Sequence, residues 1–356
     1  MLRYTVLYSH SMPEFRYRKH ILKFIRPAGT SRGVLYEKPS YFLEAFDGKE
    51  LVGVGECSTI VDLSIDHRDD YEEQLEKVVE ALNSGKQEDS IVDGEKWPSI
   101  QFGIETLFKS LESPDPFRLF ETSFLQGNGI AINGLVWMGA FDQMLEEAQS
   151  KGGLGFECLK FKIGAIDFEK EVEMIARCRE AFPNLHIRLD ANGAFSKKDV
   201  FEKLDRLAVF KIHSLEQPVK PKQWDLMKEL CAGSPIPIAL DEELIGVYKR
   251  EEKEELMQAL NPSILILKPS LLGGFKSCDE WIELANEHQA KWWATSALES
   301  NVGLNAIAQW VSQYENEEAQ GLGTGQLYLN NINSPLSIRN GYLYYLGNER
   351  WNYFKS

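Results

Sequence analysis

Five charged residues occur at nearly equal intervals in the second half of the chain. They are Lys162, Asp190, Glu216, Asp241 and Lys268, separated by 28, 26, 25 and 27 residues. Three carboxylates that meet in a partly dry site repel one another strongly unless a cation lies among them. Oxygen ligands without cysteine or histidine favour a hard ion. We therefore expect Mg²⁺, with Mn²⁺ as a substitute, at Asp190, Glu216 and Asp241.

The two lysines on either side of the carboxylates suggest proton transfer. A carboxylate substrate bound to Mg²⁺ has a more acidic neighbouring C–H, and the metal stabilises the enediolate that forms when a lysine removes this proton. Lys162 and Lys268 would face each other across the metal. Lys160 points to the same side of its strand as Lys162 and could supply the positive charge that lowers the pKa of the base. The expected partner is a small-molecule carboxylate.

Each of these residues lies at or near the end of a short apolar run that is typical of a buried strand. Helical patterns separate the runs, and one strand, one helix and two loops fill about 27 residues. The sequence thus predicts consecutive βα units of a TIM-like α/β barrel, with the functional groups at the C-terminal ends of its strands. The six runs are Leu159–Lys162, Ile187–Asp190, Ser214–Glu216, Ile238–Asp241, Leu265–Lys268 and Trp293–Ser296.

The length of the chain leaves room for a second domain. It has 356 residues, whereas a bare eight-unit barrel needs roughly 250. Strand patterns followed by helical patterns precede the barrel, so we assign residues 1–126 to an α+β capping domain that the tail, residues 330–356, completes. Residues 127–329 form the barrel. Its first strand is expected at Ile130–Gly134, and the glycine-rich Gly321–Gln326 is a weak candidate for the eighth.

Composition and charge exclude several other functions. The net charge of -15 disfavours nucleic acid as a partner. No apolar run approaches the roughly 20 residues of a membrane span, so we expect no membrane association. The start, Met1–Val6, alternates like a strand and lacks the features of a signal peptide, which predicts a cytoplasmic protein. The sequence carries no signal for an oligomeric state.

Each candidate residue has a simpler interpretation when it is taken alone. An aspartate between a strand and a helix more often caps the helix than binds a metal. Lys160 and Lys162 could form a solvated strand face, whereas Lys268 follows a fully buried strand, where a lysine needs a partner. The joint order at equal spacing favours the metal site. A non-catalytic barrel that binds Ca²⁺ for structural reasons is the alternative from a different class, and it gives Lys162 and Lys268 no role.

The constellation resembles the enolase superfamily and, within it, the muconate-lactonizing-enzyme subgroup. That subgroup carries Lys-x-Lys on the second barrel strand, Asp, Glu and Asp on the third to fifth, and Lys on the sixth. The resemblance implies Mg²⁺ and a modified (β/α)7β barrel with an α+β capping domain. Further matching segments are Asp190–Gly193, Glu216–Pro218, Asp241–Glu242, Lys268–Pro269 and Leu272–Gly274.

Within the subgroup, Ser296–Gly303 resembles the serine-rich segment of members that dehydrate a succinyl-substituted ring. This likeness implies Mg²⁺-dependent syn dehydration of 2-succinyl-6-hydroxy-2,4-cyclohexadiene-1-carboxylate to 2-succinylbenzoate, a carbon-oxygen lyase reaction of menaquinone biosynthesis. Lys162 would remove the α-proton and then protonate the departing hydroxyl, while Lys268 stays cationic. Substrate contacts are expected from five residues, which are Arg32, Asn192, Ser296, Glu299 and Ser300.

Other interpretations of the substrate site stay open. Arg32 lies in the loop Gly29–Lys38, the expected lid of the capping domain, and could equally be a solvated surface arginine. Ser296 and Ser300 could cap the helix that follows. N-succinylamino acid racemisation, dipeptide epimerisation and muconate cycloisomerisation use the same lysines in this subgroup. Dipeptide epimerases usually carry Asp-x-Asp near the eighth strand, and Gly321–Tyr328 has no acidic residue.

Overall fold

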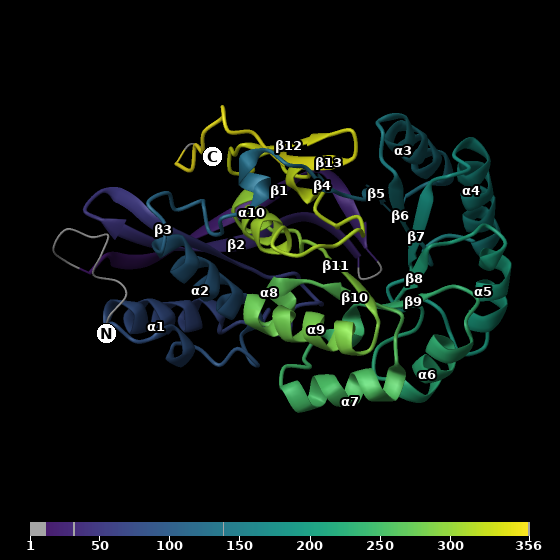
Figure 1. The fold of residues 1–356 in the computed structure, drawn as a ribbon, viewed down its shortest axis with the longest axis horizontal. Coiled ribbons are helices and arrows are strands. Elements are labelled where there is room, and N and C mark those ends of the chain that lie inside the picture. Colours follow the sequence, from purple (N-terminus) through teal and green to yellow (C-terminus); the bar gives the residue numbers. More distant parts are fainter. Residues whose placement is uncertain (1–11, 31–32, 138, 355–356) are drawn as a thin grey trace.

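The computed structural model describes residues 12–30, 33–137 and 139–354. An antiparallel sheet with two helices lies beside a curved parallel sheet that carries further helices on its outer side (Figure 1). The predicted α/β barrel with an α+β cap is therefore confirmed. The strand pattern expected at Met1–Val6 lies outside the described residues. The domain division at residue 126 stays a prediction.

The sheet of the cap has three antiparallel strands in the order β1-β2-β3. Their bounds are β1 Glu14–Thr30, β2 Gly33–Asp47 and β3 Glu50–Ser58. A tight turn at Gly48 and Lys49 joins β2 to β3 as a hairpin. The prediction of a loop at Gly29–Lys38 is wrong for most of this segment, because β1 and β2 continue to pair as far as Thr30 and Gly33.

Two helices cover the sheet of the cap, and the second lies between the sheet and the barrel. Their bounds are α1 Tyr71–Asn83 and α2 Pro98–Leu111, and almost every residue of α2 is buried. α2 packs so closely on β3 that a Cβ at Gly55 would lie 1.9 Å from the carbonyl oxygen of Gly103. Glycine is therefore required at Gly55. Short 3-10 turns follow each helix, η2 Glu88–Ser90 and η3 Ser123–Gln126.

The parallel sheet contains seven strands that neighbour one another in chain order. The six runs identified in the sequence form β6 to β11, as predicted. The first strand requires a correction: Ile130–Ala131 forms β4, which pairs with the C-terminal tail, and Gly134–Val136 pairs with β6. The bounds are β5 Gly134–Val136, β6 Cys158–Lys162, β7 His186–Asp190, β8 Ser214–Glu216, β9 Ile238–Leu240, β10 Ile264–Leu267 and β11 Lys291–Ala294.

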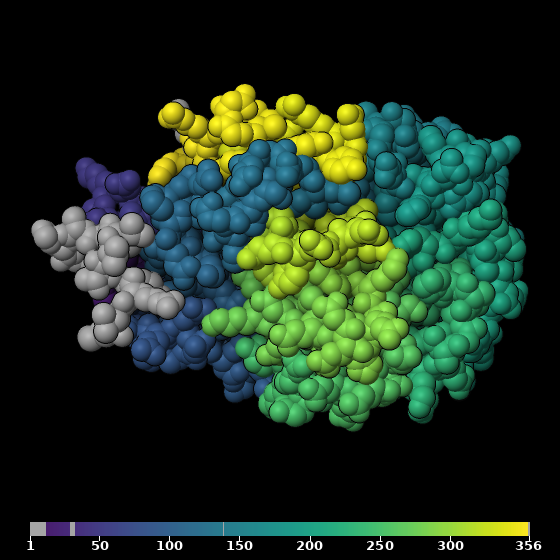
Figure 2. Space-filling model, in the orientation of Figure 1, coloured from purple at the N-terminus to yellow at the C-terminus, as the bar shows by residue number. Residues whose placement is uncertain are grey.

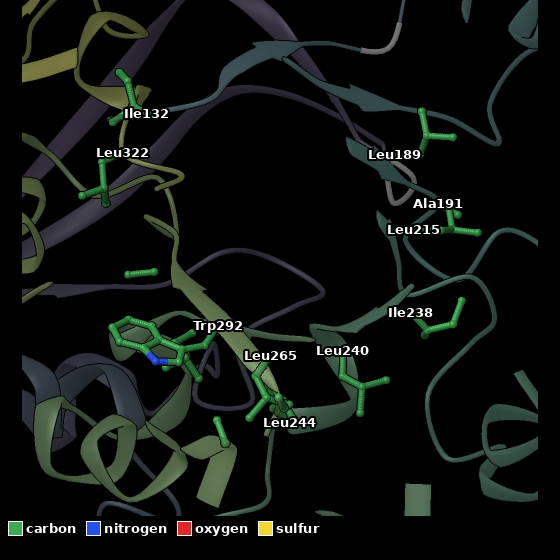
Figure 3. Close-up of a cluster of buried hydrophobic side chains, with 14 of the residues drawn as sticks. Ile132, Leu189, Ala191, Leu215, Ile238, Leu240, Leu244, Leu265, Trp292 and Leu322 are labelled. Atoms are coloured by element: carbon green, nitrogen blue, oxygen red, sulfur yellow. The ribbon is translucent and has the colours of Figure 1, made fainter. Parts of the chain in front are cut away.

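Side chains that alternate along these strands pack in two separate hydrophobic clusters, one on each face of the sheet. Ala239, Ile264, Ile266 and Trp293 form a small cluster of their own, distinct from the large cluster that includes the surrounding helices. The intervening residues, such as Leu215, belong to the large cluster. Figure 3 shows Leu189, Leu215, Ile238 and Leu240 on the side of their strands that faces away from the centre of the curved sheet. Polar residues that share the inner parity therefore project toward the barrel axis.

Helices connect the strands on the outer side of the sheet (Figure 1). Some begin at a side-chain cap, as at Asp167, which accepts a hydrogen bond from the Glu169 amide. No helix in the described parts of the chain is long and apolar enough to cross a membrane. The bounds are α3 Phe141–Gly153, α4 Phe168–Ala181, α5 Val200–Ala208, α6 Trp224–Gly233, η4 Glu242–Leu244, α7 Arg250–Leu260, α8 Pro269–Leu272, α9 Phe275–Glu287 and α10 Asn301–Val311.

The gap between β11 and the first strand is closed by two residues. Gly321 forms a parallel bridge with Thr295, and Gln320 forms one with Ile132. A Cβ at Gly321 would lie 2.3 Å from the Thr295 hydroxyl oxygen, so glycine is needed there. The eighth strand expected at Gly321–Gln326 is thus reduced to this contact, and Thr324–Gln326 forms a 3-10 turn, η5.

The tail joins both parts of the molecule. Its strands, β12 Leu336–Arg339 and β13 Tyr342–Tyr345, pair with each other, and β13 also pairs with β4. Trp351 stacks on Phe117 at 4.2 Å, and Tyr353 donates a 2.7 Å hydrogen bond to Glu44 in the cap. Figure 2 shows the yellow tail lying against the blue segment that leads from the cap to the barrel. The tail therefore contacts the cap through Tyr353 and also pairs with β4, which precedes the parallel sheet.

A carboxylate of the capping domain binds the N-terminal end of one barrel helix. Glu105 on α2 accepts hydrogen bonds from the backbone amides of Phe275 and Lys276, the first two residues of α9. Burial raises the pKa of Glu105 to about 7, although these amides and Gln101 oppose the shift. The amides would otherwise lack partners at a helix start, so this contact ties the cap to the barrel.

The raised pKa of Glu105 predicts a pH-dependent stability. Between pH 4.5, its ordinary pKa, and about 7 the folded chain keeps a proton that the unfolded chain releases. The stability from this proton is complete below pH 4.5 and is lost as the pH rises through 7, with a slope of at most about 1.4 kcal/mol per pH unit. Glu105→Gln should remove this slope in urea unfolding measured from pH 5 to 8. The exposed Glu112→Gln is the control, and equal slopes in wild type and Glu105→Gln would contradict the prediction.

Candidate active site

The register of the barrel strands brings the predicted residues to one rim. Lys162 pairs with Asp190, and Asp190 pairs with Glu216, across three neighbouring strands. Asp241 and Lys268 follow the ends of the next two strands, β9 and β10. All five residues thus lie at the C-terminal ends of the strands, where barrel enzymes have their active sites.

Lysine ammonium groups contact each of the three carboxylates. Lys160 Nζ lies 2.7 and 2.6 Å from the two oxygens of Glu216 and 2.9 Å from Asp190 Oδ2. Lys162 Nζ lies 2.5 Å from the same Asp190 oxygen. Lys268 donates to Asp241 Oδ2. All three carboxylates are at least 98% buried, so these contacts lie in a region of low dielectric.

The pKa shifts at the rim follow from burial and crowding. Burial raises the pKa of Glu216, and the negative charges of Asp190 and Asp241 raise it further. Burial acts in the same direction on Asp190, but Lys160 and Lys162 outweigh it and hold the pKa of Asp190 below its usual range. Burial opposes the charged form of Lys160, yet Asp190 and Glu216 raise its pKa. Lys160 is therefore a permanent positive charge beneath the rim.

The side chains at the rim supply carboxylate oxygens, which are suitable ligands for a hard cation. Asp190, Glu216 and Asp241 supply buried oxygens, and the crowding that raises the pKa of Glu216 is what a divalent cation would relieve. Within the described ranges, no group of three or more histidine, cysteine, aspartate or glutamate side chains has the arrangement of a preformed metal site. The lysine contacts explain this, because ammonium groups take up the oxygens that a cation would use. The assignment of these residues as metal ligands stays a prediction.

Asn192 and Glu242 extend the rim beside Lys162. The Asn192 amide oxygen accepts a 2.9 Å hydrogen bond from Lys162 Nζ, and its Nδ2 donates to Glu242 Oε1 at 2.9 Å. Asn192 has φ of +44°, a left-handed conformation that asparagine tolerates better than most residues. The structure therefore places Asn192 against the expected base. Glu242 was not assigned a role from the sequence, although it directly follows Asp241.

Gln217 was also missed by the sequence analysis. It is fully buried, and its amide oxygen accepts hydrogen bonds from the backbone amides of Asp241 and Glu243 at 3.3 and 3.1 Å. Its φ is +40°. Gln217 thus ties the residue after β8 to the residues after β9 and orients Asp241. The signals for Gln217 in the sequence are its position directly after Glu216 and its place in the matching segment Glu216–Pro218.

The serine-rich segment after β11 is directed into the protein. Ser296 donates to Glu299 at 2.7 Å, and Glu299 also accepts from Ser270. Ser300 is the N-cap residue of α10, where its hydroxyl accepts a hydrogen bond from the Val302 amide. The same hydroxyl donates a 2.5 Å hydrogen bond to Glu56 of the capping domain. The expected substrate-binding side chains of Ser296, Glu299 and Ser300 are therefore buried, with protein partners. Their role in substrate binding stays a prediction, and the capping interpretation of Ser300 is confirmed.

Arg32, the fifth predicted substrate residue, lies outside the described residues. The described part of the β1–β2 hairpin lies over the rim, where Leu22, Phe24 and Ala28 pack in one cluster with Leu271 of α8 and Leu298 of the loop after β11. Phe24 also forms an antiparallel bridge with Tyr328. The rim therefore has an apolar cover contributed by the cap.

Comparison with known proteins agrees with this geometry. Residues 143–346 match the family model of the enolase C-terminal domain-like proteins. The chain is 42% identical over 368 residues to an o-succinylbenzoate synthase from Desulfotalea psychrophila, a match that covers 93% of this chain and 98% of that protein.

Solved structures show the same relationship. MenC from Desulfotalea psychrophila superposes with a TM-score of 0.82 and 38% identity, covering 94% of this chain and 99% of that one. A dipeptide epimerase from Enterococcus faecalis, complexed with Mg and a dipeptide, superposes with a TM-score of 0.80 over 95% of this chain and 99% of its own. At 18% identity the latter likeness shows a shared fold alone. On the family match and the full-length relative, this chain belongs to the enolase superfamily.

Proposed function

We propose that this protein is a Mg²⁺-dependent carbon-oxygen lyase that converts 2-succinyl-6-hydroxy-2,4-cyclohexadiene-1-carboxylate to 2-succinylbenzoate by syn dehydration. The observation that carries the proposal is the buried group of Asp190, Glu216 and Asp241 between Lys162 and Lys268. The choice of substrate is supported by the name of the Desulfotalea psychrophila relative, which is similar over nearly its whole length. The reaction belongs to menaquinone biosynthesis and places the protein in the cytoplasm.

In this proposal Lys162 acts twice on one face of the substrate. Its amine takes the proton from the carbon next to the carboxylate, and its ammonium then protonates the hydroxyl that leaves from the same face as water. The electron pair of the broken C–H bond becomes the new C=C bond of the aromatic ring. Asn192 accepts a hydrogen bond from Lys162 Nζ and so restrains the base.

Two other lysines keep their protons throughout. Burial disfavours the charged form of Lys268, but Asp241 and Glu216 raise its pKa, so it stays cationic and supports the negative charge that develops on the substrate carboxylate. Lys160 balances the charge of Asp190 and Glu216 from below. Asp190, Glu216 and Asp241 would hold Mg²⁺, which when bound acidifies the substrate and stabilises the enediolate.

The direct test is an assay of the purified protein with Mg²⁺ on three substrate classes. We expect aromatic product from the cyclohexadiene acid, followed by ultraviolet absorbance, at a higher kcat/KM than racemisation of N-succinyl amino acids or dipeptides. The absence of an acidic residue in Gly321–Tyr328 disfavours dipeptides, whose ammonium group would lack a partner. Activity on dipeptides alone, or on N-succinyl amino acids alone, would replace the proposed reaction by that of a subgroup neighbour.

Replacing the proposed base tests the mechanism. Lys162→Ala should lower the dehydration rate at least about 10³-fold, because both proton transfers lose their group. Its affinity for Mg²⁺, measured by calorimetry, should persist. The exposed Lys170→Ala is the matched control and should keep wild-type turnover. Near-normal turnover in Lys162→Ala would remove the assignment, and failure of wild type to exchange the α-proton of a substrate analogue in D₂O would favour a non-catalytic metal-binding barrel.

Removal of the metal tests the three carboxylates. Activity should disappear after dialysis against EDTA and return with Mg²⁺ or Mn²⁺. Glu216→Gln should weaken Mg²⁺ binding at least about tenfold, since loss of a charged ligand acts more strongly than loss of an outer contact. The exposed Glu315→Gln is the control, and circular dichroism should verify that both variants fold. Unchanged Mg²⁺ affinity in Glu216→Gln would place the metal elsewhere.

A further inference from the structure

A buried lysine of the cap lies above the serine-rich segment. Lys38 on β2 is 3% exposed, and its Nζ donates to the Ser58 hydroxyl and, at 3.0 Å, to the backbone oxygen of Leu298. Leu298 belongs to the loop after β11, so Nζ lies at the boundary between the cap and the rim. In the sequence, Lys38 ends the segment expected to form a lid, and its residue type alone indicates no function.

Within the described part of the chain, the ammonium group of Lys38 has only neutral oxygens as direct partners. Neither recorded hydrogen bond joins it to a carboxylate, and no ion pair of Lys38 occurs among the residues that the structure describes. Glu56 and Glu299 lie near enough to raise its pKa, but burial outweighs both and lowers it. A buried cation without a paired anion is costly, and an incoming carboxylate would offset that cost.

The two nearby glutamates are already committed to other partners. Glu56 accepts hydrogen bonds from the amides of Ser300 and Gly303 at the start of α10, and from the hydroxyls of Ser40 and Ser300. Glu299 accepts from the hydroxyls of Ser270 and Ser296. Neither is free to turn toward Lys38 without leaving these donors unpaired.

A cavity of about 200 Å³ adjoins Lys38. Its wall includes Leu35 and Ile60, which also pack in the cluster with Leu271 and Leu298. The cavity therefore borders the apolar cluster that joins the cap to the segments after β10 and β11. Exposed Glu37 and His67 also line the cavity, so the buried amine of Lys38 and the apolar side chains form the part that suits a short aliphatic chain ending in a carboxylate.

We propose that Lys38 binds the second carboxylate of the substrate, the one at the end of the succinyl chain. This inference rests on the proposed function and deepens it, because it assigns the cap residue that selects dicarboxylates. The ring carboxylate stays at the rim, and the succinyl chain extends toward the cap. Lys38 forms a charge-assisted hydrogen bond with the terminal carboxylate, which becomes the missing counterion.

A purely structural function does not explain a lysine at this position. The oxygen of Leu298 already accepts a 2.7 Å hydrogen bond from the Tyr328 hydroxyl, so the loop after β11 is held without a charge. Anchoring alone would be served by an uncharged donor, which is cheaper to bury. The charge is explained when an anion enters the cavity.

Two matched ligands test the assignment. 2-Succinylbenzoate and 2-butanoylbenzoate differ only in that a methyl group replaces the terminal carboxylate, and calorimetry with Mg²⁺ present measures their affinities. Wild type should prefer 2-succinylbenzoate by about tenfold or more. Lys38→Met should bind both within about twofold of each other, and Lys38→Arg should keep part of the preference.

Tyr328→Phe is the matched control, because it removes the other donor to Leu298 and leaves the charge in place. It should keep the wild-type preference, whereas a structural function of Lys38 predicts that both variants change the two affinities equally. If Lys38→Met does not fold, the wild-type preference and Lys38→Arg decide. Equal affinities in wild type, together with normal dehydration, overturn the Lys38 assignment alone. A preference lost in Lys38→Met without any dehydration overturns the proposed reaction and keeps the anion subsite.

Discussion

The structure depends on the balance of charge at one rim of the barrel. Asp190, Glu216 and Asp241 are buried together, and their mutual repulsion would be prohibitive without the ammonium groups of Lys160, Lys162 and Lys268. Lys160 and Lys162 come from β6 and the other four groups from the ends of β7 to β10, so no single strand can hold this arrangement. The barrel is the means by which five strand ends keep these six groups within contact.

The barrel and its rim could be predicted because their signals are local. Apolar residues alternate in each strand, a polar residue follows the last apolar one, and the interval to the next strand is nearly constant. Exceptions arose where pairing depends on distant segments. Ile130–Ala131 has the pattern of a barrel strand, yet it pairs with Tyr342 and Leu343 in the tail. Gln320 and Gly321 close the barrel through backbone contacts, to which side-chain patterns contribute little.

The substrate side of the site was less predictable, for a physical reason. A serine hydroxyl can bind a substrate, cap a helix or join a buried network, and the sequence does not distinguish these. Ser300 caps a helix and also joins a buried network, and its partner Glu56 in that network lies 244 residues away in the chain. The environment of Lys38 was equally hard to predict from the sequence. A lysine near a glycine-bracketed segment suggests a solvated loop, whereas Lys38 lies within a paired strand and is buried against Ser58 and the distant Leu298.

The barrel rim and the capping domain have different functions in the proposed reaction. In the proposed reaction the rim acts on the C–H bond next to a carboxylate, a feature that many acids possess, so the rim by itself would not distinguish one acid from another. Selection must come from groups that meet the remainder of the substrate. Glu56 and Glu105 bind the starts of α10 and α9, so the cap cannot shift without exposing unpaired helix amides. The cap is thereby held in the position that the proposed contact between Lys38 and the terminal carboxylate of the substrate requires.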